Sequence, residues 1–292
     1  MKLTAECLCG SSESIILRTG VRYDPALQIR ECKKCGLIYL WPRPGEEELL
    51  SYYQSEYRKE YDNDSPHDIR FRSDTEEARI RVSRLTGLLS GEKSLLELGS
   101  GSGAFLNAAS IYAKNVTGVE PDRKTREWII SRCGFRVVGE LSELNQKVEK
   151  FDLVVLFHAL EHMVNPIEFC KSLKGVIKPT GHLIIEVPNI DDALVSLYKI
   201  KSYIDFYYQK AHLFYFSSAT LKWVLDQAGY NSDIVGVQRY DLSNHIRWML
   251  DGKPGGKGYY HNIFLQSTNQ SYADSLIRSG YADTLWAIAR LR

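Results

Sequence analysis

Residues 95–105 read LLELGSGSGAF, and this short stretch says more about the fold than any other part of the chain. An apolar run that carries one acid, Glu97, breaks into three alternating glycines and then continues as a helix-compatible sequence. A buried strand that turns into a helix through glycines is typical of α/β folds whose backbone closely approaches a nucleotide-like ligand. The glycines alone leave the ligand open, because Gly99, Gly101 and Ala104 also satisfy the dinucleotide pattern G-x-G-x-x-G/A.

Apolar runs of strand length alternate with helical segments on both sides of this turn. We expect strands at 94–98, 115–120, 135–139, 151–160, 181–188, 233–240 and 284–291, and helices at 105–113, 123–134, 166–177 and 220–230. Such alternation predicts an α/β fold with a doubly wound, mostly parallel seven-stranded sheet. Between the last two strands we expect a helical insert with the glycine-rich loop DGKPGGKG, which either cradles a phosphate or is a mobile surface loop.

The polar segment before the core is helix-compatible. Residues 74–89 predict a helix with an apolar stripe formed by Ile80, Leu85, Leu88 and Leu89. Further upstream, four tyrosines fall partly on one helical face and could cover a ligand or pack as an aromatic stripe: Tyr52, Tyr53, Tyr57 and Tyr61. We therefore interpret residues 46–90 as a helical linker or lid.

Composition limits the classes of partner. The 37 basic and 36 acidic residues give a net charge of +1, which provides no overall electrostatic footprint for nucleic acid or anionic lipid. The N-terminal residues lack the apolar core of a signal peptide, and no apolar run reaches 18 residues. These features predict a cytoplasmic protein with no membrane partner and make a nucleic-acid partner unlikely; the oligomeric state stays open.

Four of the six cysteines cluster near the N-terminus: Cys7, Cys9, Cys32 and Cys35. Four thiolates suit a tetrahedral structural Zn²⁺, and the Cys32-x-x-Cys35-Gly spacing is a typical half-site. The Cys7-x-Cys9 spacing departs from that pattern, so zinc binding and free thiols both remain open. We expect residues 1–45 to form a small module resembling a zinc ribbon.

Several motifs, in order along residues 90–240, resemble class I S-adenosylmethionine-dependent methyltransferases. LLELGSGSGAF is similar to their first motif, and GVEPD is similar to the second. FDLVVLFHALEHMVNP resembles their segment at the fourth strand, and AHLFYFSSATLKWVLDQAGY resembles the segment after the fifth. A dehydrogenase has no reason to carry the last two segments. The resemblance implies a methyltransferase core at 91–240, followed by an insert and final strand at 241–292 that shape the acceptor site.

The resemblance also implies roles for individual residues. Glu97 would support the ammonium group of S-adenosylmethionine, Glu120 would bind its ribose hydroxyls, and His158 would line the sulfonium region. The remaining cofactor-binding residues implied are Gly99, Ser100, Gly101, Gly103, Pro121, Glu140 and Leu141. A sulfonium beside an ammonium is better matched by acidic and neutral groups than by lysines.

Histidines supply the candidate bases for methyl transfer, which needs an aligned nucleophile and a proton acceptor. The candidates are His158, His162 and His212. His212 lies beyond the fifth strand, where the family builds its acceptor site. The alternative is that His212 is a structural histidine. The Glu161-His162 pair has a structural alternative too, in which it orders the turn after the fourth strand. Similar sugar C-methyltransferases tend to have glutamate before this histidine, whereas here it is Ala211, so O- or N-methylation is favoured.

The acceptor predicted from these resemblances is a small polar molecule: a sugar, a nucleotide sugar or another surface-glycan precursor. The alternatives are a quinone- or lipid-like metabolite, and a nucleic acid or protein to which a zinc ribbon would dock.

Overall fold

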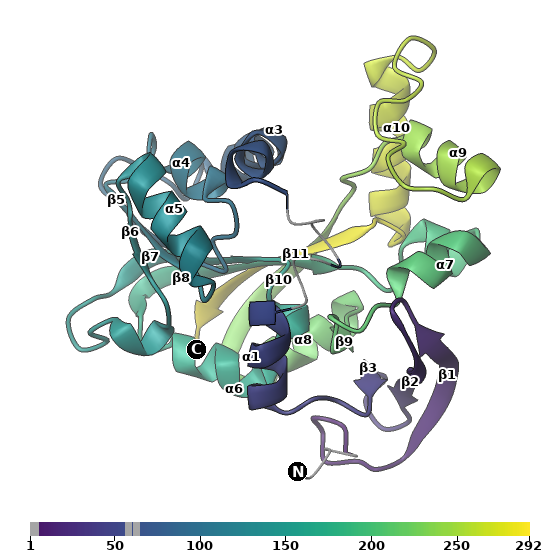
Figure 1. The fold of residues 1–292 in the computed structure, drawn as a ribbon, viewed down its shortest axis with the longest axis horizontal. Helices are drawn as coiled ribbons and strands as arrows, with labels where there is room; N and C mark the ends of the chain where they lie inside the picture. Colours follow the sequence, from purple (N-terminus) through teal and green to yellow (C-terminus); the bar gives the residue numbers. More distant parts are fainter. Residues whose placement is uncertain (1–5, 56–59, 61–64) are drawn as a thin grey trace.

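A seven-stranded sheet organises the computed structural model, which describes residues 6–55, residue 60 and residues 65–292 (Figure 1). The sheet order is β10-β11-β8-β7-β4-β5-β6. Its strands are β4 (Ser94–Leu98), β5 (Asn115–Val119), β6 (Arg136–Val138), β7 (Phe151–Phe157), β8 (Ile177–Pro188), β10 (Tyr230–Val237) and β11 (Thr284–Leu291). Only β11 runs antiparallel to its neighbours β8 and β10. The predicted doubly wound, mostly parallel α/β sheet is confirmed.

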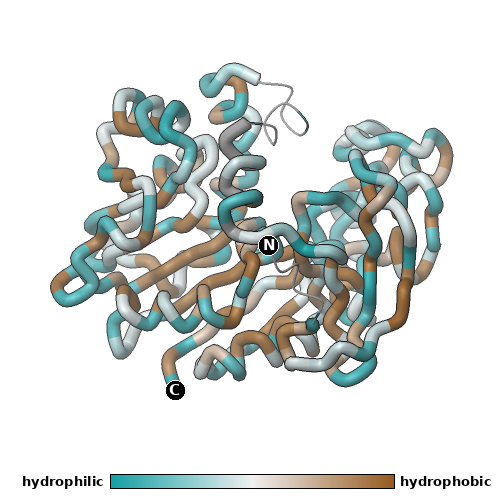
Figure 2. The backbone as a smooth tube through the Cα atoms, turned by 60° about the horizontal axis from the view of Figure 1, so that its bottom comes forward, coloured by the Kyte–Doolittle hydropathy of each residue, from teal (hydrophilic) through white to brown (hydrophobic). Residues whose placement is uncertain are grey.

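Helices cover both faces of this sheet, which explains why central strands such as β7 are buried throughout. The helices α3 (His67–Leu85), α4 (Ala104–Ala109) and α5 (Arg123–Cys133) lie on one face, and α6 (Pro166–Leu173) and α8 (Ser218–Gln227) lie on the other (Figure 1). The hydrophobic stretches run through the sheet between polar outer segments (Figure 2). Two buried cores therefore sandwich the sheet.

Several strand boundaries differ from the sequence prediction. Strand β7 ends at Phe157, because His158 adopts a left-handed backbone conformation with φ 50° that the pleat cannot continue. Strand β8 begins at Ile177, before the predicted start at residue 181. Strand β10 ends at Val237, so the residues that follow it leave the sheet and can face a ligand.

Helix α3 also differs from its prediction. It ends at Leu85, and its buried residues are Ala78, Val82 and Leu85 at intervals of one helical turn. Of the predicted stripe, Leu85 and Leu89 are buried, whereas Ile80 and Leu88 are only partly buried. The polar side of this helix contributes to the site described below.

A second, four-stranded sheet contains the N-terminal segment. Its order is β1-β2-β3-β9, from β1 (Ser14–Val21), β2 (Asp24–Cys32), β3 (Ile38–Trp41) and β9 (Phe214–Tyr215). Strand β9 pairs antiparallel with β3 although the two are far apart in sequence. The N-terminal segment and the region after β8 therefore share one sheet.

The remaining elements surround these sheets. They are α1 (Glu46–Ser55), the short turns η1 (Leu141–Glu143), η2 (Leu160–His162) and η3 (Ala193–Leu197), and the helices α7 (Lys201–Tyr207), α9 (Leu242–Asp251) and α10 (Gln266–Ser279). The α9–α10 insert projects beyond the sheet at the upper right of Figure 1. Tyr57 and Tyr61 of the predicted lid lie outside the described residues. Within the described parts of the chain, no helix is long and apolar enough to cross a membrane.

Candidate functional site

The turn after β4 depends on its glycines. Gly99, Gly101 and Gly103 all have positive φ, at 75°, 52° and 76°. Gly103 is the N-cap of α4, and a Cβ there would lie 3.0 Å from Cγ1 of Ile129, tighter than ordinary contact. Ala104, the residue that also fits a dinucleotide pattern, lies inside α4. The third required glycine is therefore Gly103.

Glu120 joins this turn to the end of β5. Its Oε2 accepts a hydrogen bond from the backbone N–H of Gly101 over 2.8 Å, and its Oε1 accepts one from the N–H of Asp122 over 3.0 Å. The carboxylate is thus fixed at the carboxyl ends of two adjacent parallel strands, where ligands bind in such sheets.

Glu97 is a buried acid at the wall of a cavity. Its side chain is almost fully buried, and no described residue is a hydrogen-bond partner of its Oε2. Burial raises the pKa of Glu97 well above its ordinary value, and the nearby charges of Glu120 and Asp74 raise it further. A cationic ligand group at this oxygen would relieve the cost of an unpaired buried carboxylate.

A cavity of about 390 Å³ lies over the glycine turn. Five of the residues predicted from sequence line it: Glu97, Gly99, Ser100, Gly101 and His158. The other predicted residues lie outside this lining: Gly103, Glu120, Pro121, Glu140, Leu141, His162 and His212. Glu120 nonetheless reaches the lining through its bond to Gly101.

The segment predicted to contact adenine follows β6. Glu140 is exposed there and accepts a hydrogen bond from Oγ of Ser142 over 3.1 Å, while Leu141 packs partly against the core. The carbonyl of Pro121 accepts a hydrogen bond from Nη1 of Arg126 over 3.2 Å. Their adenine-binding roles stay predictions.

Sequence reasoning missed a charged wall of the cavity: Glu77, Arg81, Arg239 and Lys257 line the cavity, and Glu186 lies behind Arg81. Glu186, fully buried on β8, binds Arg81 through both oxygens, with Nη2–Oε1 at 2.6 Å and Nε–Oε2 at 3.2 Å. Arg239, just beyond β10, contacts Glu77 through Nε at 3.1 Å. Although burial alone would raise the pKa of Glu77, Arg239 and Arg81 lower it. Lys257 of the glycine-rich loop also lines the cavity, 3.8 Å from Glu77.

One sequence signal could have identified part of this wall. Glu186 interrupts the apolar run LIIEVP, and a buried acid needs a cationic or hydrogen-bonding partner. Arg81 and Arg239 carry no comparable signal, because an arginine on a polar helix face or after a strand is usually solvated.

His158 connects the cavity to a second group of buried side chains. Its Nε2 lies 2.8 Å from Oε1 of Glu186, and its Nδ1 lies 3.4 Å from Oε1 of Glu161. Nη1 of Arg239 also contacts Nε2. Burial and Arg239 act to lower the pKa of His158, but the two carboxylates outweigh them and raise it. This histidine therefore has polar neighbours on both sides.

Glu161, His162 and His212 lie together behind His158. One ligand-type atom from each falls within 4.8 Å of the others. The rings of His162 and His212 meet edge to face, with centroids 4.8 Å apart. Burial lowers the pKa of both histidines, that of His212 to about 3. His212 thus has a carboxylate neighbour, Glu161, even though position 211 is alanine.

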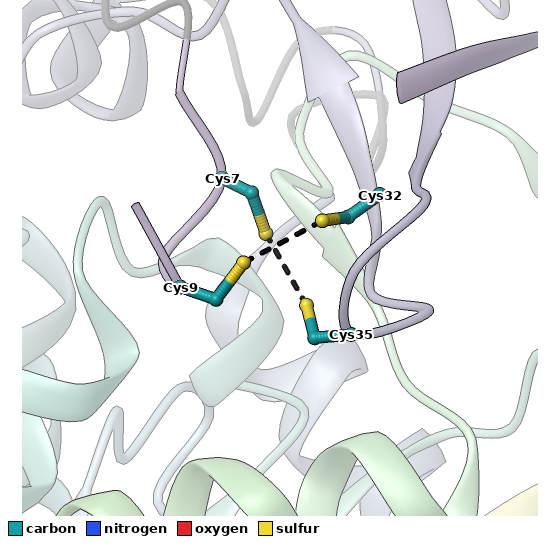
Figure 3. Close-up of side chains that lie close together, drawn as sticks. All are labelled: Cys7, Cys9, Cys32 and Cys35. Atoms are coloured by element: carbon teal, nitrogen blue, oxygen red, sulfur yellow. Dashed lines mark hydrogen bonds between the residues drawn. The ribbon is translucent and has the colours of Figure 1, made fainter. Parts of the chain in front are cut away.

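The four N-terminal cysteines converge between two loops (Figure 3). Sγ of Cys7 lies 3.5 Å from Sγ of Cys35, and Sγ of Cys9 lies 3.5 Å from Sγ of Cys32. Sulfur ligands bound to zinc at about 2.3 Å stand roughly 3.8 Å apart in a tetrahedron. The Cys7-x-Cys9 spacing therefore does not prevent convergence, and the four sulfurs fit a zinc ion.

A family model described as a methyltransferase domain matches residues 70–233, more than half of the chain. The motifs, the glycine turn and the sheet order agree with this match, and the chain belongs to that methyltransferase family. It is a class I S-adenosylmethionine-dependent methyltransferase.

Individual relatives are distant. An uncharacterized protein from Methanocaldococcus jannaschii is 25% identical over 185 residues, covering 63% of this chain and 82% of the relative. A ubiquinone biosynthesis O-methyltransferase from Actinobacillus pleuropneumoniae is 27% identical over 110 residues, covering 33% of this chain and 46% of the relative. Such limited similarity does not identify the acceptor.

Solved structures share the fold. A SAM-dependent methyltransferase from Archaeoglobus fulgidus has a TM-score of 0.51 at 21% identity, covering 75% of this chain and 95% of that one. Another from Thermotoga maritima has a TM-score of 0.51 at 20% identity, covering 80% and 98%.

Proposed function

We propose that this methyltransferase acts on an oxygen or nitrogen of a small polar acceptor, with a sugar, nucleotide sugar or other surface-glycan precursor as the favoured class. One observation carries the proposal. The cavity over the glycine turn continues to Arg239, Tyr240 and Lys257, which come from the segment after β10. An acceptor held by that segment would meet the methyl donor inside a single cavity.

The charge of this wall favours an anionic acceptor. Arg81 and Arg239 are compensated by Glu186 and Glu77, whereas Lys257 is about half exposed and its Nζ lies 3.8 Å from Oε2 of Glu77. A lysine ammonium on a glycine-rich loop suits a phosphate group, as a nucleotide sugar would carry.

The cofactor would bind across the glycine turn. We assign its ammonium group to Glu97 and its ribose hydroxyls to Glu120. The backbone of Gly99, Ser100, Gly101 and Gly103 would pass close to it, and Pro121, Glu140 and Leu141 would flank the adenine. The unpartnered Oε2 of Glu97 supports the first assignment.

Methyl transfer is a direct displacement: an acceptor lone pair forms the new bond to carbon while the sulfur–carbon bond breaks. We propose that His158 takes the acceptor proton, since it is the candidate histidine that lines the cavity. His162 and His212 would act as positioning residues through Glu161. The preference for oxygen or nitrogen still rests on Ala211, and the carboxylate of Glu161 beside His212 weakens it.

A methyl-transfer screen tests the proposal. Purified protein with labelled S-adenosylmethionine is offered nucleotide sugars and the corresponding unphosphorylated sugars, and NMR of the product identifies the methylated atom. We expect transfer to a phosphate-bearing acceptor, and a KM raised roughly tenfold or more by Lys257→Ala, the effect of losing one charged contact. Lys253→Ala, in the same loop but outside the cavity lining, is the control. Equal turnover of charged and uncharged acceptors would contradict an anionic acceptor.

A quinone precursor is the second candidate. The similarity to a ubiquinone biosynthesis O-methyltransferase favours it. Methylation of a catechol in the same screen, without transfer to any sugar, would replace the first candidate by this one.

We further propose that Cys7, Cys9, Cys32 and Cys35 hold a structural Zn²⁺, because four thiolates leave no open coordination position. We also propose a cytoplasmic location, since none of the six cysteines forms a disulfide and reducing compartments preserve that state.

A further inference from the structure

The group formed by Glu161, His162 and His212 contains more unsatisfied buried atoms than a structural histidine pair requires. Glu161 is 1% exposed, and neither of its carboxylate oxygens has a hydrogen-bond partner among the described residues. Nδ1 of His158 lies 3.4 Å from its Oε1, and Nε2 of His162 lies 4.0 Å from the same oxygen. A carboxylate this deeply buried needs a cation close to both oxygens.

The two histidines are oriented as metal ligands usually are. Nδ1 of His162 lies 2.8 Å from the carbonyl oxygen of Ala211 and can only donate to it, which leaves Nε2 with its lone pair on the side of Glu161. A second ring nitrogen bound to a backbone carbonyl is the common way in which a metal-binding histidine is fixed.

His212 repeats this arrangement with the opposite nitrogens. Its Nε2 lies 2.6 Å from Nε2 of the Gln209 side chain, and its buried Nδ1 has no hydrogen-bond partner among the described residues. The oxygen and nitrogen of an amide are assigned from its hydrogen bonds, and with the Gln209 amide flipped its oxygen accepts the proton of His212 Nε2, which leaves the lone pair on Nδ1. Both rings then present a lone pair beside the same carboxylate.

Backbone contacts hold the two contributing segments together. The N–H of Leu213 donates to the carbonyl of Glu161 over 2.8 Å, next to the bond between His162 and Ala211. The three ligand atoms lie within 4.8 Å of one another, and ligands bound to an ion at about 2.1 Å stand roughly 3.4 Å apart. Metal binding would therefore draw the most distant pair of these atoms together by up to about 1.4 Å.

We propose that Glu161, His162 and His212 bind a divalent first-row transition-metal ion, separate from the cysteine site. Two imidazoles and one carboxylate are ligands that such ions accept, and three protein ligands leave a coordination position for a water molecule. His158, which contacts both Glu161 and the cavity wall, places the ion one side chain away from the cofactor cavity. The use of the ion in catalysis rests on the proposed methyl transfer, whereas its binding does not.

Cobalt titration of protein that carries a single Zn²⁺ per chain, bound by the cysteines, tests the site. Equilibrium dialysis gives the Co²⁺ stoichiometry, and absorption spectra distinguish histidine–carboxylate ligation from thiolate ligation, which adds intense sulfur-to-metal charge-transfer bands. We expect one Co²⁺ per chain without those bands. The wild-type protein alone can overturn the proposal. It would do so if it bound no cobalt, or if the bound cobalt showed only thiolate bands.

Matched variants locate the ion. We expect Glu161→Gln and His212→Gln to weaken Co²⁺ binding at least tenfold, with folding checked by circular dichroism. Glu168→Gln and His261→Gln make the same chemical changes at residues outside the group and should bind Co²⁺ as the wild type does. Equal affinity in all four variants would also overturn the proposal. Cobalt binding is measured without an acceptor, so failure of the methyl-transfer screen would not contradict the ion site. Likewise, absence of cobalt binding would not contradict the proposed methyl transfer.

Discussion

The backbone N–H of Gly101 donates to the carboxylate of Glu120 over 2.8 Å, so the glycine turn and the acid after β5 form one unit. Ribose hydroxyls that bind Glu120 would share its carboxylate with the backbone N–H groups of Gly101 and Asp122. We expect Glu120→Gln to lower the affinity for S-adenosylmethionine about ten- to a hundredfold, because a charge-assisted hydrogen bond contributes about 1.5–3 kcal/mol. Calorimetry measures the change, and Glu127→Gln on the exposed side of α5 serves as the control. Unchanged affinity in Glu120→Gln would remove the ribose assignment.

Glu97 gives a second prediction, on proton release. Because the pKa of Glu97 is raised in the free protein and an ammonium partner favours the ionised carboxylate, binding should release protons. Affinity for S-adenosylmethionine should therefore fall as the pH drops below that raised pKa. Calorimetry in buffers of different ionisation enthalpy measures the protons released. Glu97→Gln should reduce this number, and an identical number in the variant would show that another group supplies the proton.

Gly103 tests the geometry of the turn. We expect Gly103→Ala to lower the free energy of unfolding by about 1–3 kcal/mol, since the new methyl group meets Ile129 and the backbone is left-handed. Gly134→Ala has a similar φ of 73° but open space around the added carbon, so it isolates the cost of the backbone conformation. Denaturant unfolding measures both variants. If both variants lose the same free energy of unfolding, the contact with Ile129 does not destabilise Gly103→Ala.

Asp152 predicts how stability depends on pH. Burial alone would raise the pKa of Asp152, but its bonds to Lys178 at 2.7 Å and to Ser94 lower it below the ordinary value. A carboxyl with a lowered folded pKa stabilises the protein above its unfolded pKa, near 4, and this stability is lost as the pH falls through the lower folded value. Asp152→Asn should cost about 1–3 kcal/mol at pH 7 and progressively less below pH 4. A difference independent of pH would exclude this explanation.

Metal removal gives the fifth prediction. We expect about one equivalent of zinc bound by thiolates, lost in Cys32→Ser together with a lower melting temperature. Cys133→Ser, which lies outside the cluster, should retain the metal. Metal analysis by mass spectrometry with thermal unfolding measures both effects. Zinc retained in full by Cys32→Ser would place it elsewhere.

The sequence predicted the parts of this protein whose signals are local. The glycines after β4 and the acid in GVEPD follow from strand–turn–helix chemistry. The alternation of apolar runs with helical segments predicted where strands and helices follow one another along the chain. The wall formed by Glu77, Arg81 and Arg239 could not be predicted in the same way. Each of these residues is an ordinary polar residue in its own segment, and only the packing of α3 against the end of β10 makes them partners.

The histidines show the same limit on a smaller scale. The sequence singled out His158, His162 and His212, but not which of them lines the cavity. His158 does so because β7 ends one residue earlier, at a left-handed backbone position. The carboxylate beside His212 comes from Glu161 and not from residue 211, and this proximity of distant residues cannot be read from a sequence motif.

The pairing of β9 with β3 has a consequence for how the chain can be divided. His212 lies two residues before β9, and β3 is the neighbour of β2, which ends at Cys32. Cutting the chain after residue 45 would leave β9 without its partner strand and would uncover Phe214 and Tyr215, which are now almost fully buried. We therefore expect the segment that carries the cysteines to be needed for stable folding of the methyltransferase core.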